Sequence, residues 1–192
     1  FWTVDFESKA LRMISPDSGI GVRRVFWYML YELSNRSDED RQVFVNITGA
    51  SDHNKRYADL FLPSVERAIE KKEGRSLWGK VDEFEITSKR KPTNPKYSYM
   101  TLKAGQTRYC VAVFNRLDPN ANHIKISVSG LSNEIRQSTA ADGTSVLEER
   151  MREFSFERAG DEHEITLDSF TPAGRAWTLR QVPAAGSHGP GQ

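Results

Sequence analysis

The sequence has very little cysteine, since Cys110 is the only one among 192 residues. One cysteine cannot form an internal disulfide bond, so the fold has to be stabilised by a hydrophobic core. A chain of this length buries roughly two thirds of its unfolded surface as one domain, which suffices without disulfides or metals. Cys110 lies in the apolar run 109–114, and we expect it to be a small buried hydrophobic residue instead of a reactive thiol.

Long hydrophobic runs and an excess of one charge are also lacking. No stretch of about 18 apolar residues is present, so we expect no transmembrane segment in this sequence. The formal net charge is only +1, with 28% charged residues, so no global field would draw the chain to nucleic acid or to an anionic membrane. We therefore expect no nucleic-acid partner, and membrane association only peripherally, through a membrane complex.

Motifs for catalysis and cofactor binding are incomplete. Gly19-x-Gly21 lacks the third glycine of a dinucleotide loop and precedes a predicted strand where a helix is required. The turn at 118–123 opens like a calcium loop, but histidine stands where the loop needs glycine, so ordinary turn chemistry is favoured. The segment around Ser132 resembles a nucleophile elbow without its second glycine. No histidine pair has metal-site spacing, and we expect no metal, no cofactor and no catalysis.

Residues 24–33 form the stretch that is densest in aromatic and apolar side chains. It is short for a buried helix, and turn-forming residues flank it on both sides, which favours a β-strand. Trp27 and its alternate neighbours face one way, while Tyr28 and Leu30 face the other, so we predict a central strand that is covered on both faces. We expect Trp27 to pack across the fold against residues 111–113.

Alternating apolar and polar residues predict further strands. We expect the strands at 24–33 and 42–48 to pair antiparallel across the polar connector 34–40. Residues 134–145 are polar and predict a loop. Residues 146–157 fit helix or strand, because the first half has helical spacing and the end alternates. The other predicted strands lie at 2–14, 78–86, 97–102, 107–114, 124–128, 163–167 and 175–182.

One helix is predicted inside an insertion at about 49–96 that interrupts the strand rhythm. Pro63 suits the first turn, and Gly74 suits the position just past the last turn. Val65 and Ile69 stack four residues apart in a narrow apolar stripe. At about ten residues the helix would be marginal alone, so it must dock on the sheet or on a neighbouring protein.

A basic loop is predicted at 88–96. It is interpreted either as a solvated loop that protects a sheet edge or as a patch for phosphate or lipid headgroups. The apolar stripe of the helix and the positive charges of this loop are the candidate contacts to a partner protein. They are Val65, Ile69, Lys89, Arg90, Lys91 and Lys96.

These elements predict a mostly β fold, namely an immunoglobulin-like antiparallel β-sandwich of about eight or nine strands with one short helix at about 63–72. We expect a single domain at 1–182 and a flexible tail at 183–192, which is rich in glycine, alanine and proline. The aromatic residues exceed the need of one sandwich core, which indicates a contact surface for another protein.

Three motifs follow one another in a specific order. They are Trp27-Tyr28-Met29-Leu30-Tyr31-Glu32-Leu33-Ser34-Asn35, Leu117-Asp118-Pro119-Asn120-Ala121-Asn122-His123 and Val128-Ser129-Gly130-Leu131-Ser132-Asn133. This order resembles a family of uncharacterised exported bacterial β-sandwich proteins, over roughly residues 2–182. The resemblance implies a mostly β fold and a secreted or periplasmic setting, and it brings no known activity, cofactor or catalytic residue.

We therefore expect a non-catalytic interaction or accessory subunit of a larger extracytoplasmic assembly, with other protein subunits as partners. Phe1 stands where an unprocessed chain would have methionine, so the N-terminus is either processed or truncated. With the resemblance to exported proteins, we expect a removed export signal and a periplasmic or extracellular location. The alternative is a module that binds carbohydrate or a surface polymer through Trp2, Trp78, Tyr97 or Tyr99. A hydrolytic enzyme is a further alternative, which would need a pocket of converging ionisable groups.

Overall fold

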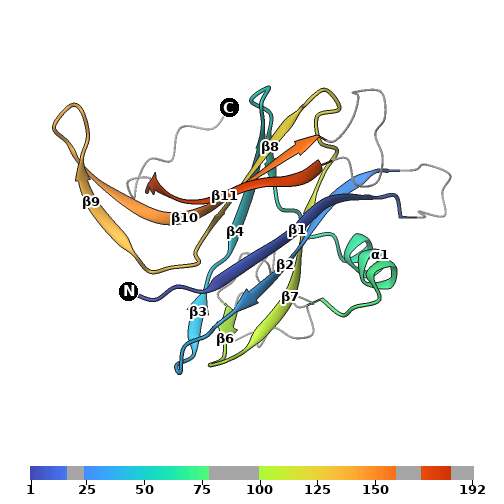
Figure 1. Cartoon of the computed structure of the whole chain (residues 1–192), viewed down its shortest axis with the longest axis horizontal. Helices are drawn as coiled ribbons and strands as arrows, with labels where there is room; N and C mark the ends of the chain where they lie inside the picture. Colours follow the sequence, from blue (N-terminus) through green and yellow to red (C-terminus); the bar gives the residue numbers. More distant parts are fainter. Residues whose placement is uncertain (17–23, 78–99, 159–169, 183–192) are drawn as a thin grey trace, which may run out of the picture.

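The computed structural model describes residues 1–16, 24–77, 100–158 and 170–182. Within these ranges most residues belong to antiparallel strands, and one helix packs against their outside (Figure 1). The mostly β class predicted from the sequence is therefore confirmed, with the strands in a sandwich-like or barrel-like arrangement. No helix in these ranges is long and apolar enough to cross a membrane.

The strands and the helix have the following bounds. They are β1 (Asp5–Ile14), β2 (Phe26–Ser34), β3 (Arg41–Val43), β4 (Asn46–Ser51), β5 (Arg56–Ala58), α1 (Pro63–Glu73), β6 (Met100–Leu102), β7 (Thr107–Phe114), β8 (His123–Ser129), β9 (Ile135–Thr139), β10 (Ser145–Arg158) and β11 (Phe170–Gln181).

Hydrogen bonding runs through one continuous sheet in the order β5-β4-β8-β10-β11-β1-β2-β7, with β9 paired to β10 and with β3 and β6 forming a separate pair. The two ends of this sheet meet just after β5. The Asp59 N–H donates to the Ile47 carbonyl of β4 at 3.2 Å, and the Leu60 N–H donates to the Val113 carbonyl of β7 at 2.7 Å. The Val113 N–H in turn donates to Asp59 Oδ1 at 2.9 Å. The sheet thus curls around a core and is closed by the Asp59–Leu60 connection.

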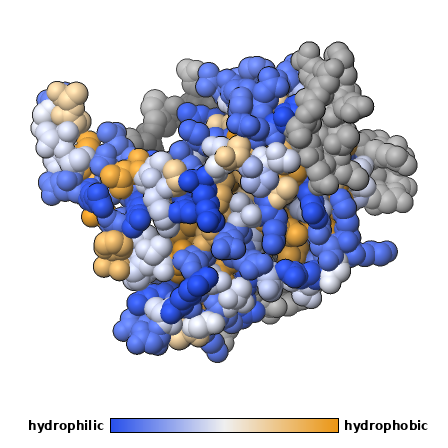
Figure 2. All heavy atoms as spheres, in the orientation of Figure 1, coloured by the Kyte–Doolittle hydropathy of each residue, from blue (hydrophilic) through white to orange (hydrophobic). Residues whose placement is uncertain are grey.

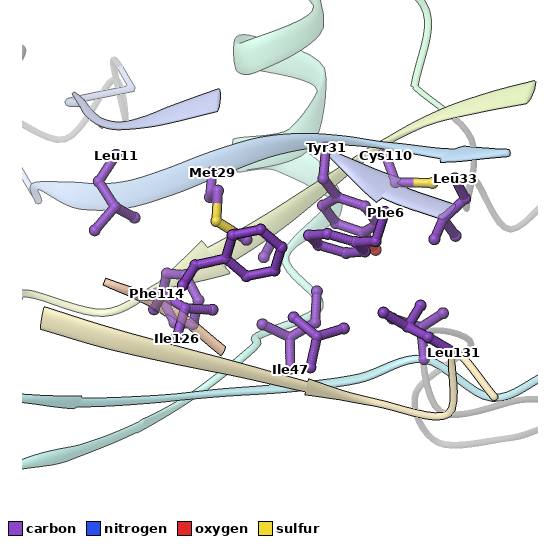
Figure 3. Close-up of a cluster of buried hydrophobic side chains, with 14 of the residues drawn as sticks. Phe6, Leu11, Met29, Tyr31, Leu33, Ile47, Cys110, Phe114, Ile126 and Leu131 are labelled. Carbon is purple, nitrogen blue, oxygen red and sulfur yellow. The ribbon is translucent and has the colours of Figure 1, made fainter. Parts of the chain in front are cut away.

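The main core fills the inside of the curled sheet (Figure 3). The Phe6 ring stacks on Tyr31 at 4.7 Å between ring centres and lies 5.1 Å from Phe154. Trp27 meets Phe170 edge to face at 5.4 Å. The prediction that Trp27 packs against residues 111–113 was wrong, because β7 is the hydrogen-bonded neighbour of β2 and Trp27 is paired with Phe114 in register.

β2 is covered on both faces, as its sequence predicts. Trp27 and Met29 lie in the main core, whereas Tyr28 is fully buried in a second cluster on the outside of the sheet. The helix α1 supplies the cover for this second cluster through Val65 and Ile69, which are 4% and 0% exposed. The apolar stripe of the helix therefore docks on the chain's own sheet.

The ends of α1 follow the predicted signals. Pro63 stands in the first turn, and Gly74 adopts the left-handed conformation just past the end with φ 62°. A polar clip holds the last turn on the sheet, because the Tyr28 hydroxyl donates to Glu73 Oε1 at 2.5 Å and Arg12 Nη1 lies 3.1 Å from Glu73 Oε2.

The structure differs from the predictions in two strand regions. The segment predicted as a strand at 42–48 does not pair with β2, because β1 and β7 already occupy both edges of that strand. It is divided into β3, which pairs with β6, and β4, which pairs with β8 and β5. The polar region 134–145 contains β9, a mostly exposed strand whose residues after Ile135 are polar. Residues 146–157 belong to strand β10.

Some predictions lie outside the described residues. These are the strands at 78–86 and 163–167, the basic loop at 88–96 and the tail at 183–192.

Candidate functional site

A three-stranded extension projects from the curled sheet. It consists of β9, residues 145–151 of β10 and residues 178–181 of β11, and Figure 1 shows β9 and the adjacent part of β10 reaching away from the other strands. Ile135 is 62% exposed and Leu147 is 49% exposed. The pairing of Ile135 with Glu149 places Ile135 and Leu147 on the same face of the extension. Hydrophobic and charged residues accordingly alternate over this part of the surface (Figure 2).

A seam separates β11 from its neighbour β1. The two strands share a single paired position, Leu11 with Phe170. Next to this paired position, both strands contain a bulge. The bulge in β1 lies between Ser8 and Leu11, and the bulge in β11 lies opposite Ser155 and Phe156 of β10. Bulges bend strands and increase their twist, so β1 and β11 diverge. Among the described residues, the edge of β11 that faces the seam has no further strand partner.

A cavity of about 190 Å³ lies in the seam and is lined by residues of both diverging strands. Its walls are Asp5, Phe6, Glu7, Arg152, Arg175 and Trp177.

Three arginines surround Trp177 on the inner face of the seam. The Cζ atoms of Arg150 and Arg152 lie 4.4 and 4.9 Å from the centre of the Trp177 ring. Burial lowers the pKa of Arg152, and the nearby charges of Arg175 and Arg150 lower it further. Arg150 is paired with Glu134 at 3.0 Å. Within the described ranges, Arg152 and Arg175 form no ion pair with a carboxylate, although the charge of Asp5 acts on Arg152 and partly offsets the lowering of its pKa. Arg152 Nε is buried without a hydrogen bond.

The chain turns from β8 into the extension at a corner that Glu134 organises. Arg136 Nε donates to Glu134 Oε1 at 2.7 Å, and Arg150 Nη1 donates to Glu134 Oε2 at 3.0 Å. The hydrogen bond from Arg136 is the largest cause that lowers the pKa of Glu134, and that from Arg150 lowers it further. Desolvation by burial opposes them. Glu134 therefore neutralises Arg150 but forms no ion pair with Arg152 or Arg175, and Asp5 and Glu7 are the carboxylates that line the same cavity.

No protein-family model, curated protein or solved structure matches this chain. Its function has to be inferred from geometry.

A larger cavity opens at one end of the barrel, where β1, β7 and β10 end and β2 begins. We call it the barrel-end pocket. It has a volume of about 680 Å³, and its lining includes Met13, Arg24, Trp27, Arg116, Asp118 and Arg158.

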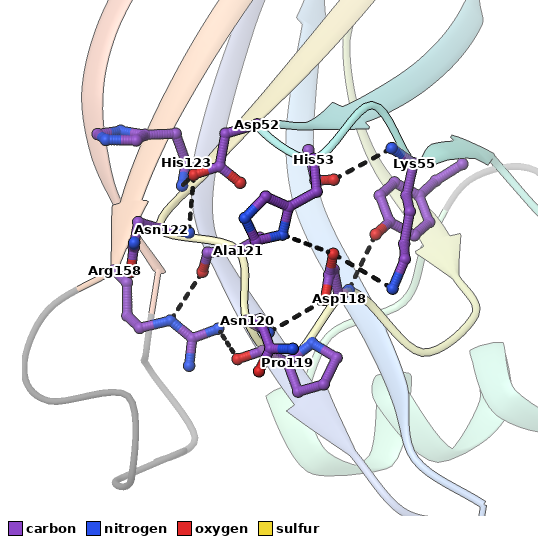
Figure 4. Close-up of polar contacts among 12 residues, drawn as sticks. Asp52, His53, Lys55, Asp118, Pro119, Asn120, Ala121, Asn122, His123 and Arg158 are labelled. Carbon is purple, nitrogen blue, oxygen red and sulfur yellow. Dashed lines mark hydrogen bonds and ion pairs between the residues drawn. The ribbon is translucent and has the colours of Figure 1, made fainter.

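Asp118 is the centre of a polar network beside this pocket (Figure 4). Its side chain is 1% exposed, and its Oδ2 lies 3.1 Å from His53 Nδ1 and 3.2 Å from Lys55 Nζ. The Asn120 N–H donates to Asp118 Oδ1 at 3.0 Å, which makes the predicted turn an Asx turn. The backbone hydrogen bond from Asn120 is the largest cause that lowers the pKa of Asp118, and His53 and Lys55 add to it.

The pair of His53 and Asp118 has no nucleophile attached to it in the described part of the chain. The one hydrogen-bond partner of the His53 ring there is Asp118 itself. In the same residues, no three histidine, cysteine, aspartate or glutamate side chains converge in a way that could hold a metal ion. The hydrogen bonds and ion pair of this network stabilise the loop that carries Asp118.

The described part of the chain includes two of the six predicted partner contacts. Val65 and Ile69 are buried between α1 and the sheet, so they are not available to a partner. The four basic residues of the predicted loop, Lys89, Arg90, Lys91 and Lys96, lie outside the described residues. Of the aromatic residues considered for carbohydrate binding, Trp2 is partly buried against the main core, and Trp78, Tyr97 and Tyr99 lie outside the described ranges.

Sequence reasoning missed Arg152, Arg175 and Trp177. A signal existed in the alternation of arginine with apolar residues at 150–154 and of Arg175 with Trp177. This signal did not identify the cluster, because residues 146–157 fitted helix as well as strand. Only the two-residue period of a strand places Arg150 and Arg152 on one face.

Proposed function

We propose that this protein is a non-catalytic interaction subunit that binds an extended, acidic segment of a partner protein along the open edge of β11. One observation carries the proposal. Arg152 and Arg175, which form no ion pair with a carboxylate within the described ranges, stand beside a strand edge that pairs with β1 at only one position. An incoming carboxylate would compensate both guanidinium groups, and an incoming strand would complete the sheet.

The backbone supports strand addition. An open edge presents unpaired N–H and C=O groups, which are the usual template for an extended peptide. Pro172 has no N–H and interrupts this edge near its start, so the usable part is at about 174–181. A segment of this length supplies main-chain affinity, while its side chains supply specificity.

The side-chain pattern of β11 defines the partner segment. Arg175, Trp177 and Leu179 alternate along one face, and Leu179 is 42% exposed. Directly opposed residues on neighbouring strands contact each other. The matching segment therefore carries an acidic residue opposite Arg175 and an apolar residue opposite Leu179, four positions apart.

The extension adds a second contact area on its other face. Ile135 and Leu147 are exposed side by side there, without a cover from the described part of the chain. We place this subunit in a larger assembly outside the cytoplasm, periplasmic or extracellular, which agrees with the resemblance to exported proteins.

A labelled peptide tests the proposal. The probe is an extended threonine-rich peptide with two glutamates and one valine at alternate positions, and the control peptide has lysine in place of glutamate. Fluorescence anisotropy should give binding of the glutamate peptide at least about tenfold tighter than of the lysine peptide. Arg175→Ala and Arg152→Ala should each weaken it about fivefold to tenfold, and Arg67→Ala on α1 should leave it unchanged.

A surface polymer is the alternative ligand, since the arginines and Trp177 also suit an anionic polysaccharide. Polygalacturonate is the probe for it. Binding of polygalacturonate without binding of the glutamate peptide would assign the site to a surface polymer. Binding of neither, together with a lone monomer in native mass spectra of the protein from its source, would remove the interaction function.

A further inference from the structure

We infer that the barrel-end pocket is a separate binding site for a small organic anion, in which a carboxylate or phosphate group is attached to a compact apolar body. The pocket is distinct from the seam. Its volume of about 680 Å³ lies within the range of typical ligand sites.

The sheet register brings arginines to this end of the barrel. β2 and β7 pair antiparallel up to Trp27 and Phe114. Arg24 precedes Trp27 and Arg116 follows Phe114, so both extend from the same end of the strand pair. Neither side chain has an ion pair among the described residues. Two guanidinium groups that line one cavity are suited to bind an oxyanion, because each presents paired N–H donors.

The third arginine holds the wall of the pocket. Arg158 Nε donates to the Ala121 carbonyl at 2.9 Å, and Arg158 Nη2 donates to the Pro119 carbonyl at 2.6 Å. Figure 4 shows these bonds fixing the loop that carries Asp118. Arg158 thus adds positive charge to the site and orders its rim.

The acidic residue in the lining does not cancel this charge. Asp118 is already bound by Lys55 and His53, with Lys55 Nζ at 3.2 Å. Lys55 balances the Asp118 charge, so among the described lining residues the charges of the three arginines are in excess. A negatively charged ligand is favoured over a neutral or cationic one.

Apart from Asn115, the remaining lining is apolar. Trp27, Met13 and Val25 face the cavity from the ends of β1 and β2, and Leu117 lies across from them at the end of β7. Such a surface gains free energy from burying a hydrocarbon or aromatic body. The combination explains why the expected ligand needs both an anionic group and an apolar part.

Three probes with the same aromatic body test the inference: naphthyl phosphate, naphthoate and naphthol. Calorimetric titration of the full chain should show that at least one anion binds at least about tenfold tighter than neutral naphthol. The stronger of the two anions identifies phosphate or carboxylate as the preferred group. The double variant Arg24→Ala/Arg116→Ala should weaken anion binding at least about tenfold and leave the affinity for naphthol unchanged.

Matched variants make the result decisive. Arg67→Ala removes an exposed arginine of α1, and Arg175→Ala removes one from the seam, so both should keep wild-type anion affinity. Circular dichroism verifies that every variant is folded. The inference is overturned if naphthol binds as tightly as the anions, if none of the probes binds at millimolar concentration, or if Arg175→Ala instead of the double variant loses binding.

Discussion

Gly130 stands at a position that no other residue fits without rearrangement. Its φ is +80°, and a Cβ atom added there would lie 1.7 Å from the Phe44 carbonyl oxygen. Gly143 has a similar φ of +85°, but a Cβ atom there would meet nothing within 4 Å. The two glycines separate the effect of backbone conformation from that of a close approach.

Gly130→Ala should destabilise the protein by more than about 3 kcal/mol, because strain and a backbone clash add up. Gly143→Ala should cost only about 1–2 kcal/mol, which is the price of the left-handed conformation alone. Urea unfolding followed by circular dichroism measures both. Equal losses in the two variants would contradict the close contact at Gly130.

Trp27 is 4% exposed in the main core against Phe170. Trp27→Ala should lower the free energy of unfolding by about 3–5 kcal/mol, because it leaves a large cavity that the core fills only in part. Phe1→Ala is the control, since Phe1 is 80% exposed and its loss should change stability by less than about 0.5 kcal/mol. A wild-type midpoint for Trp27→Ala in guanidinium chloride would show that Trp27 is not a core residue.

At the scale of elements, single polar residues hold parts of the sheet and the helix together. Asp59 joins the two ends of the sheet through its hydrogen bond with the Val113 N–H. Glu73 joins the helix to β1 and β2 through Arg12 and Tyr28. In both cases a buried or half-buried carboxylate compensates donors that the strands would otherwise leave unpaired.

Asp59→Ala should destabilise the protein by about 1–3 kcal/mol, because the Val113 N–H would stay buried without an acceptor. Asp59→Asn keeps an acceptor oxygen and should lose less. Native-state hydrogen exchange should show faster exchange of the Val113 amide in Asp59→Ala than in Asp59→Asn. The same protection of Val113 in both variants would mean that Asp59 does not close the sheet.

The clip on α1 should depend on pH. Desolvation acts to raise the pKa of Glu73, but the hydrogen bonds from Tyr28 and Arg12 outweigh it and lower the pKa below its ordinary value. A lowered pKa in the folded state means that the stabilisation is present above the unfolded pKa and is lost as the pH falls through the folded pKa. Glu73→Gln should therefore cost about 1–2 kcal/mol at pH 7 and much less near pH 3. A pH-independent difference between the two proteins in urea unfolding would contradict this.

At the scale of the whole molecule, the extension presents exposed hydrophobic side chains that lie outside the core. Leu147 is 49% exposed and Ile135 is 62% exposed, so neither contributes much to the core. Leu147→Asp should change the free energy of unfolding by less than about 0.5 kcal/mol, and under the proposed interaction function it should weaken association with a partner protein. Thermal unfolding and size-exclusion chromatography of the material from its source measure the two effects. A large fall in stability would place Leu147 inside the fold instead of on a contact surface.

The sequence by itself determined the elements of this protein. The alternation of apolar residues predicted β2 as a strand covered on both faces, and Pro63 and Gly74 marked the ends of the helix, because these signals lie within a few neighbouring residues. Burial of Cys110, which is 3% exposed, followed from the same local pattern.

Only the tertiary structure decided which strands are neighbours and where candidate sites form. Residues 134–145, expected to be a polar loop, contain β9, and residues 146–157, which fitted helix or strand, belong to β10. Bulges in β1 and β11 open the seam that gathers Arg152, Arg175 and Trp177. The barrel-end pocket likewise joins residues from the ends of four strands. Strand partners are selected by the packing of the whole core, and a one-residue bulge changes the direction of a strand without a strong local signal. The sequence therefore specifies the parts, and the closure of the sheet around its core specifies the sites.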